Sequence, residues 1–346
     1  SQRLIEQSPL FLDGLLDLNG FSETTTGALN LAAPTGQVAL GDGGSLTVSS
    51  ATSFQGIMTG GAGSSFATSA GALTLGVGTS SIALNNGTVT VNGALSTSGS
   101  IATGGGAVTA ATAIAVNLGG QILTGGGGLT GGGALSTSGL LDTAGGDITG
   151  ITTTTVNAGG QILTGGGTLT GNGTLAITSG LIDTAGGDIT GITTTTVNAG
   201  GRILTGGGDL TGSGALTHNV GGLIDLGDGG ALTVLSATTF AGSLVGGPDT
   251  SVNTTGGALT LNAATSSIAL DGGTVTVTGG ALTISNVAGS LTTNGGAVTA
   301  DGNLAITGTL DSGGGAVATT GAAATITVNT GGQILTGGAD LSGVNG

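Results

Sequence analysis

Aliphatic residues recur along this chain at a nearly constant interval, and many are followed by threonine and then by a pair of glycines. The string VNAGGQILTGG begins at Val156, and near-copies begin at Val116, Val197 and Val328. Intermediate copies divide the longer spacings, so that the repeat is about 20 residues long. The aliphatic residues that anchor successive repeats are Val38, Ile57, Ile82, Ile101, Ile122, Leu141, Ile162, Ile182, Ile203, Ile224, Leu244, Ile268, Leu291, Leu310 and Ile334.

Most repeats contain two further aliphatic positions. One follows the anchor, as Leu169 follows Ile162, and another often precedes it by about six residues, as Val156 does. Short runs of Val, Ile and Thr surround these positions, and Gly, Asn and Asp separate them, which favours strands joined by turns. Three strands per repeat predict an all-β fold, a parallel β-helix (β-solenoid) of about 15 turns of about 20 residues. The variable repeat length favours a right-handed helix.

The outer surface of the predicted solenoid has a pattern of its own. Alternate side chains of a strand face opposite sides, so we expect Ile162 to face the core and Leu163 to face outward. The outer positions equivalent to Leu163 are, in chain order, Leu123, Asp142, Leu163, Asp183, Leu204 and Asp225. This alternation keeps the carboxylates two turns apart, which lowers their mutual repulsion. It also supports the register, because an inward aspartate would be buried without a partner.

Residues 1–26 differ from the repeats, which occupy residues 27–346. They are rich in leucine and include Leu10, Phe11 and Leu15. They lack the basic start and uninterrupted apolar core of a signal peptide, and no run is long enough to cross a membrane. We expect this segment to cap the solenoid or to dock a neighbouring subunit.

The last repeat stops at Gly346 without an amphipathic cap. A final turn of this kind would expose unpaired strand backbone, which natural proteins usually cover. We therefore expect that the native chain continues or that another copy covers the end.

The composition excludes several classes of function. The chain has two basic residues against 17 acidic ones and a net charge of −15, which leaves no basic surface for nucleic acid or anionic membranes. It has no cysteine, and therefore no disulfide framework. With 37% hydrophobic residues it does not resemble a disordered chain, and its 80 glycines lack the collagen register.

The repeat GG-x-I-x-T-x-GG-x-L-T, with its variants GGAL, SSIAL and GTVTV, resembles the β-solenoid repeats of bacterial surface adhesins. The most similar groups are filamentous-haemagglutinin-type proteins and autotransporter passengers, and the resemblance covers residues 27–346. It implies an exported, right-handed, non-enzymatic solenoid that serves adhesion or extracellular structure. The sequence shows neither a haemagglutinin-type secretion domain nor an outer-membrane barrel.

Four aspartates are the main candidates for carboxylate chemistry, and the string DLGDGG from Asp225 could supply further oxygens to a calcium site. Asp142 with Asp147, and Asp183 with Asp188, each lie within one repeat, as a glycosidase or a calcium site would require. We expect all four to shape tight corners instead, because the pairs repeat and aromatic sugar platforms are missing. The calcium-binding nonapeptide of one solenoid class is absent.

Three other features invite a functional interpretation. His218, in the string LTHNVGG, is expected to be a solvated turn residue, and Arg202 replaces a glutamine at an outward repeat position. The runs 152–155 and 193–196 consist of threonine, as an ice-binding array would. The intervening stretch 174–178 breaks that array, so we do not expect ice binding.

These observations lead to one hypothesis and two alternatives. We expect an exported structural or adhesive β-solenoid, secreted or on a bacterial cell surface, that self-associates into an extracellular filament or fibre. It would have no enzymatic activity and no cofactor, and its partners would be copies of itself or a cell-surface or matrix component. The expected contact residues are Leu10, Phe11, Leu15, Leu123, Leu163 and Leu204. The alternatives are a monomeric stalk of a larger adhesin and a polysaccharide-acting β-helix enzyme.

Overall fold

The computed structural model describes residues 10–11, 15–25, 29–31, 36–263 and 266–343. The chain divides into two compact units, Ser1–Thr170 and Gly171–Gly346. It folds as an all-β parallel β-solenoid with about 15 turns of about 21 residues, as the repeat predicts. No helix is present among the described residues.

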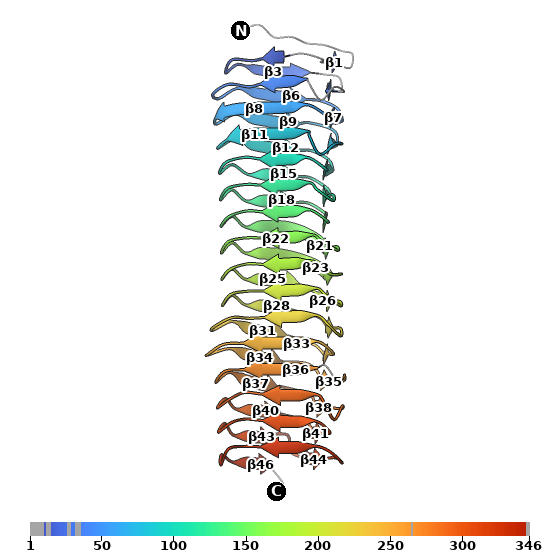
Figure 1. Ribbon diagram of the computed structural model, residues 1–346, viewed down its shortest axis with the longest axis vertical. Helices are drawn as coiled ribbons and strands as arrows, with labels where there is room; N and C mark the ends of the chain where they lie inside the picture. Colours follow the sequence, from blue (N-terminus) through green and yellow to red (C-terminus); the bar gives the residue numbers. More distant parts are fainter. Residues whose placement is uncertain (1–9, 12–14, 26–28, 32–35, 264–265, 344–346) are drawn as a thin grey trace. The chain divides into compact units, whose positions relative to one another are not determined.

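Each turn of unit 1 contributes one strand to each of three faces. Every strand pairs in parallel with the equivalent strand of the next turn (Figure 1). The strands of face 1 are β2 (Leu15–Asp17), β5 (Gln37–Ala39), β8 (Ile57–Ala62), β11 (Ser81–Asn85), β14 (Ser100–Ala102), β17 (Gln121–Leu123), β20 (Leu140–Asp142) and β22 (Gln161–Leu163).

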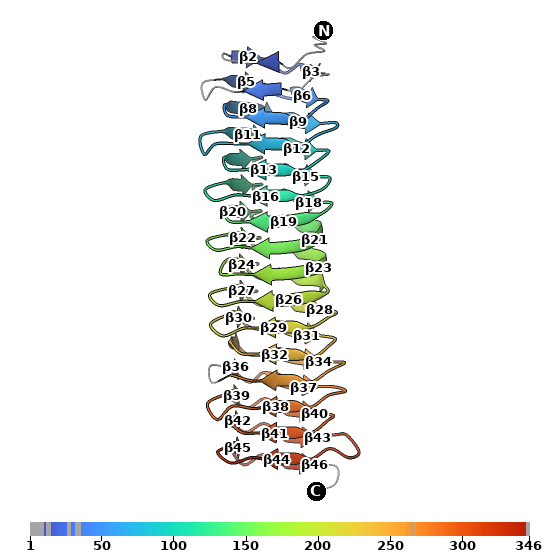
Figure 2. The same ribbon diagram turned by 90° about the vertical axis from the view of Figure 1, so that its right-hand side faces the viewer.

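Faces 2 and 3 of unit 1 follow the same scheme, and Figure 2 shows β13, β16 and β19 stacked in order. Face 2 consists of β3 (Ser22–Thr25), β6 (Ser45–Val48), β9 (Ser65–Thr68), β12 (Thr88–Val91), β15 (Val108–Ala110) and β18 (Leu129–Gly131). Face 3 consists of β1 (Leu10–Phe11), β4 (Leu29–Leu31), β7 (Thr52–Phe54), β10 (Leu73–Leu75), β13 (Leu95–Thr97), β16 (Ile114–Val116) and β19 (Ala134–Thr137). The longer β21 (Ile148–Val156) pairs with β18 and with β19, and so belongs to both faces.

Unit 2 repeats this arrangement. Its face 1 holds β24 (Leu181–Asp183), β27 (Arg202–Leu204), β30 (Leu223–Asp225), β33 (Ser243–Gly246), β36 (Ser267–Leu270), β39 (Ser290–Thr292), β42 (Thr309–Asp311) and β45 (Gln333–Leu335). Its face 2 holds β25 (Ile189–Ile192), β28 (Leu210–Gly212), β31 (Ala231–Val234), β34 (Ser251–Thr254), β37 (Thr274–Val277), β40 (Val298–Ala300), β43 (Val317–Thr319) and β46 (Leu341–Gly343). Its face 3 holds β26 (Thr194–Val197), β29 (Leu216–His218), β32 (Thr238–Phe240), β35 (Leu259–Leu261), β38 (Leu282–Ile284), β41 (Leu304–Ile306) and β44 (Ile326–Val328). The remaining strand, β23 (Leu169–Ile177), contains the boundary between the units.

The core consists of aliphatic side chains stacked from turn to turn. In unit 1, Ile101 pairs with Ile122 and Ile122 with Leu141, and all three are fully buried. No single turn encloses such a residue, so each is buried by the turns above and below it. Stacking of neighbours is therefore what makes the short strands stable.

One predicted anchor is wrong. Val38 pairs with Met58, and Gln37 pairs with Ile57, so Met58 occupies the buried column and Ile57 is only half-buried. The sequence favoured Ile57 because it is the stronger strand former. The anchor Leu244 is confirmed, since it pairs with Ile224 and is fully buried.

The aliphatic that precedes each anchor does not form one column. Leu95 pairs with Ile114, whereas Val116 pairs with Thr97. Face 3 therefore has two inward columns, and the corner that leads to face 1 varies in length between turns. A fixed spacing of six residues selects residues from both columns, because this corner is longer after Val116 than after Thr97.

Within residues 1–26, three strands pair with strands of the repeat region, and the first of them, β1, pairs with β4. Leu16 of β2 pairs with Val38 of β5, and Thr24 of β3 pairs with Thr47 of β6. Residues 1–9 and 12–14 lie outside the described part of the chain, so Arg3 has no structural account.

Candidate functional site

The outward side of face 1 carries the leucine and aspartate pattern expected from the sequence. In unit 1, Leu123 pairs with Asp142 and Asp142 with Leu163. Leu163 is half-buried, whereas its neighbour Ile162 is fully buried, which confirms the predicted register. Leu123 is half-buried as well, so both leucine side chains remain partly accessible.

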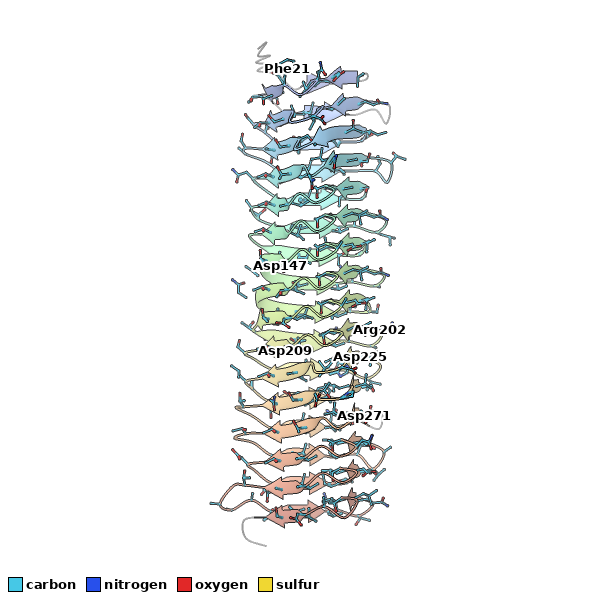
Figure 3. All side chains as sticks on the ribbon, turned by 90° about the vertical axis from the view of Figure 1, so that its left-hand side faces the viewer. Phe21, Asp147, Arg202, Asp209, Asp225 and Asp271 are labelled. Carbon is cyan, nitrogen blue, oxygen red and sulfur yellow. The ribbon has the colours of Figure 1, made fainter. Side chains whose placement is uncertain are left out.

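Unit 2 shows the same alternation on its own face 1. Asp183 pairs with Leu204 and Leu204 with Asp225. All three side chains are half-buried. Figure 3 shows Arg202 and Asp225 on the same side of this unit, apart from Asp209.

The second outward position of these strands alternates in the opposite sense. In unit 1, the two outward residues are Gln121 and Leu123 on β17, and Leu140 and Asp142 on β20. Each strand thus presents one leucine and one polar residue, and the order reverses in the next turn. Each unit has such a surface, which we call its mixed face; the residues are Gln121, Leu123, Leu140, Asp142, Gln161 and Leu163 in unit 1, and Leu181, Asp183, Arg202, Leu204, Leu223 and Asp225 in unit 2.

The predicted N-terminal contact residues are placed only in part. Leu15 begins β2 and is 64% exposed, so it is accessible to a partner. Leu10 and Phe11 form the backbone of β1, but their side chains lie outside the described part of the structure.

Asp142 and Asp183 shape corners. The Ala144 N–H donates to Asp142 Oδ1 at 2.9 Å, and the Ala185 N–H donates to Asp183 Oδ1 at 3.0 Å. Each aspartate thus closes an Asx turn two residues ahead, a role that short acidic side chains fill well. The residue that donates has a positive φ of 49° in both corners.

Asp147 and Asp188 connect successive turns instead. The Thr168 N–H donates to Asp147 Oδ1 at 2.8 Å, and the Asp209 N–H donates to Asp188 Oδ1 at 2.8 Å. Among the described residues, no three His, Cys, Asp or Glu side chains come together as a metal site would require. Each of the four aspartates thus accepts a backbone hydrogen bond, within its own corner or from the next turn.

A buried hydroxyl accompanies each T-x-G-G corner, and the sequence reasoning did not assign it a role. The Thr143 hydroxyl donates to the Gly146 carbonyl at 2.5 Å, and the Thr164 hydroxyl donates to the Gly167 carbonyl at 2.5 Å. Both threonines are fully buried. In these repeats threonine stands two residues after the anchor, as Thr143 follows Leu141, and this place was the signal that an inward threonine holds the corner.

The Asx corners offer a test of this local structure. Ala144 occupies the left-handed position that glycine fills in the equivalent corner at Gly165, where φ is 60°. Because a Cβ atom is disfavoured there, we expect Ala144→Gly to stabilise unit 1 by about 1 kcal/mol and raise its melting temperature by roughly 2–4 °C. Thermal unfolding followed by circular dichroism measures this shift.

The matched control is the reverse change in the neighbouring turn. Gly165→Ala adds a Cβ at the same left-handed position, 3.1 Å from the Gly145 nitrogen. It should lower the melting temperature. A rise with Gly165→Ala, or a fall with Ala144→Gly, would contradict the role assigned to the left-handed position.

His218 is not the solvated turn residue that the sequence predicts. It ends β29, points into the core and is fully buried. It pairs with Val197 on one side and Phe240 on the other. The apolar neighbours in adjacent turns, which the local string LTHNVGG does not contain, explain the difference.

The threonine runs also differ from the flat array considered above. Thr154 and Thr195 face the core, so each run alternates between inward and outward side chains. An outward threonine column does exist on face 2 of unit 1, where Thr109 pairs with Thr130 and Thr130 with Thr149.

A hollow at a corner of unit 2 has a volume of about 460 Å³. Glycine and alanine line most of it, together with Asp301 and Asn303. The Thr320 hydroxyl donates to Asp301 Oδ1 at 2.5 Å and the Gly279 N–H to Oδ2 at 3.1 Å, and these bonds lower the pKa of Asp301. Asp301 therefore fastens neighbouring turns, and the hollow is a gap left by small residues.

Comparison with protein-family models, with curated proteins and with solved structures finds no match for this chain. Among the described residues, no helix is long and apolar enough to span a membrane. The fold itself defines the class: the chain is a parallel β-solenoid repeat protein.

Proposed function

We propose that the chain is an exported structural or adhesive solenoid that self-associates through its mixed face. The observation that carries this proposal is the register of that face, in which Leu123 and Leu163 flank Asp142 in unit 1. Ordered apolar side chains on an outer sheet surface are typical of contact sites. Their regular spacing suits a partner with the same repeat, which a second copy of the chain has.

The polar half of the mixed face supports the same partner. A second copy packed against this surface and offset by one turn sets leucines against leucines. Gln121 and Gln161 then supply amide N–H donors for the aspartates of the partner, and in unit 2 the guanidinium group of Arg202 supplies N–H donors. Since the carboxylates are two turns apart, this arrangement avoids rows of like charge.

The adhesin class and an extracellular location rest on the resemblance of the repeats to bacterial surface solenoids. The structural roles of Asp142, Asp147, Asp183 and Asp188 favour a non-enzymatic protein. We therefore propose a secreted or surface-attached bacterial fibre protein rather than a polysaccharide-acting enzyme.

Electron microscopy and sedimentation velocity at micromolar concentration test the proposal. The unmodified protein should form oligomers or filaments. The variant Leu123→Ser, Leu163→Ser, Leu204→Ser should shift to monomers while keeping its circular dichroism spectrum. Monomers of the unmodified protein under all conditions would favour the stalk alternative and reject self-association.

A matched control alters the same number of outward residues on another face. The variant Thr109→Ser, Thr130→Ser, Thr211→Ser changes outward positions of face 2 and leaves the mixed face intact. It should assemble like the unmodified protein. Equal loss of assembly in both variants would place the contact elsewhere than on the mixed face.

A further inference from the structure

His218 occupies a column of apolar side chains inside unit 2. The equivalent inward residues of neighbouring face 3 strands are Ile177, Val197, Phe240, Leu261, Ile284 and Ile306. His218 is the single histidine of the chain. It is therefore the one member of this column that changes charge near neutral pH.

The imidazole is enclosed and unsatisfied. The residue is fully buried, and neither ring nitrogen has a hydrogen-bond partner of normal geometry. Its ring meets the Phe240 ring edge to face, with centroids 5.3 Å apart. Gly222 and Gly242 leave space for the ring, because a Cβ on either would lie 2.7 Å from Nε2.

No countercharge is available to a protonated ring. The packed strands β26 and β32 contain no ionisable side chain, and β29 contains none besides His218. On the two strands of face 1 that precede and follow β29 in the chain, the charged residues are Arg202 of β27 and Asp225 of β30, both directed outward. A buried imidazolium would thus be unpaired, which is strongly unfavourable.

We propose that His218 is an acid-sensitive break point of unit 2, at which the corner Asn219–Gly222 and the turn containing β29 open when the ring is protonated. The corner already lies at the surface, since Val220 is 51% exposed. Opening lets water reach the ring and frees the neighbouring strand edges of β26 and β32. This inference does not depend on the proposed self-association.

The direction of the effect follows from the two states of the ring. Burial lowers the pKa of His218 to about 4, partly offset by the nearby Gly222 backbone, whereas the ordinary value is 6.5. The opened state therefore binds the proton more tightly. The contribution of His218 to the stability of the closed state is fully present above pH 6.5 and falls as the pH drops from 6.5 to 4. Below pH 4 this residue causes little further change in stability. The equilibrium constant for opening should therefore be about 100-fold larger at pH 4 than at pH 7.

Native-state hydrogen exchange measures this opening directly. Protection factors of amides in β29, and of its partners in β26 and β32, should fall by about 100-fold between pH 7 and pH 4. Amides of the unit 1 core should change much less. Unchanged protection in β29 at pH 4 would overturn the proposal.

Two variants separate the charge of His218 from its packing. His218→Leu and His218→Phe keep the site apolar at every pH, as in the neighbouring turns. Both should retain β29 protection at pH 4, whatever their stability at pH 7. A pH-dependent loss as large as that of the unmodified protein would show that His218 is not responsible.

The lone histidine also permits a direct titration by NMR. Its ring signals should remain those of the neutral form at pH 5.5 in the folded protein. A folded-state titration with a midpoint near 6.5 would show that the ring is solvated and would reject the break point.

Discussion

Gly146→Ala is expected to lower the melting temperature of the protein by roughly 6–12 °C. This effect is larger than that of the other substitutions proposed here that add or remove one methyl group. A Cβ at Gly146 would lie 2.2 Å from the carbonyl oxygen of Gly127 and 2.6 Å from its carbonyl carbon. Both atoms belong to the backbone of the preceding turn, so no side chain can move aside. The two turns must separate locally, at a cost of about 3 kcal/mol.

The close approach at Gly146 has a structural reason. Its corner begins with Thr143, whose hydroxyl donates to the Gly146 carbonyl, and the chain then turns into β21. Parallel strands pair only when turns stack at the strand spacing of about 4.8 Å, which brings successive corners into direct backbone contact. Glycine is therefore required here by space, since Gly146 does not have a positive φ.

Gly76→Ala in the same unit is the control. A Cβ at Gly76 has no atom within 4 Å, so this change should be neutral or slightly stabilising. Thermal unfolding by circular dichroism compares the two variants. Equal melting temperatures would show that the corners of successive turns are not in contact.

Thr143→Val is expected to destabilise unit 1 by about 1–3 kcal/mol, although valine has nearly the same shape as threonine. The fully buried Thr143 hydroxyl donates to the Gly146 carbonyl at 2.5 Å and reaches the Thr164 carbonyl at 3.5 Å. Removing it leaves the Gly146 carbonyl oxygen without this donor in a buried corner. The loss should therefore reflect the hydrogen bond rather than packing.

An outward threonine provides the comparison. Thr109 lies at the centre of β15 on face 2 and points away from the core. Thr109→Val removes a solvated hydroxyl and should change stability by no more than about 0.5 kcal/mol. Chemical denaturation of both variants measures the difference. Similar losses for Thr109→Val and Thr143→Val would refute the role of the buried hydroxyl.

The buried hydroxyls also explain why the repeat contains threonine at all. In some repeats the inward position two residues after the anchor is a buried leucine, as at Leu40, Leu84 and Leu226, which contributes apolar burial alone. Threonine supplies a methyl group to the core and a donor to the corner. The periodic threonine was visible in the sequence, but its function depends on a carbonyl that the folded corner brings within reach.

Met58, and not the expected Ile57, occupies the buried anchor position of β8, which the pattern of neighbouring residues did not predict. Strand propensity favours Ile57, yet Gln37 pairs with Ile57 and Val38 with Met58. Which residue faces the core depends on how the corner before β8 sets the register with β5. Corner length is fixed by backbone contacts between turns, which no sequence window contains.

His218 illustrates the same limit for a polar residue. Its neighbours along the chain are those of a turn, and a solvated position was the reasonable expectation. Strand β29 includes His218, which the string LTHNVGG had placed in the turn. His218 therefore pairs with Val197 and Phe240 and lies in an apolar column.

The sequence by itself determined the repeat, the three strands of each turn and the outward alternation that places Leu163 beside Asp142. These features depend on the period-two alternation of strands and on a nearly constant repeat length, both of which are local. Only the tertiary structure decided which residue of Met58 and Ile57 is buried, that Thr143 closes its corner, and that His218 lies in an apolar column. Those outcomes depend on contacts between turns, about 20 residues apart in the chain, whose register is set when the turns stack.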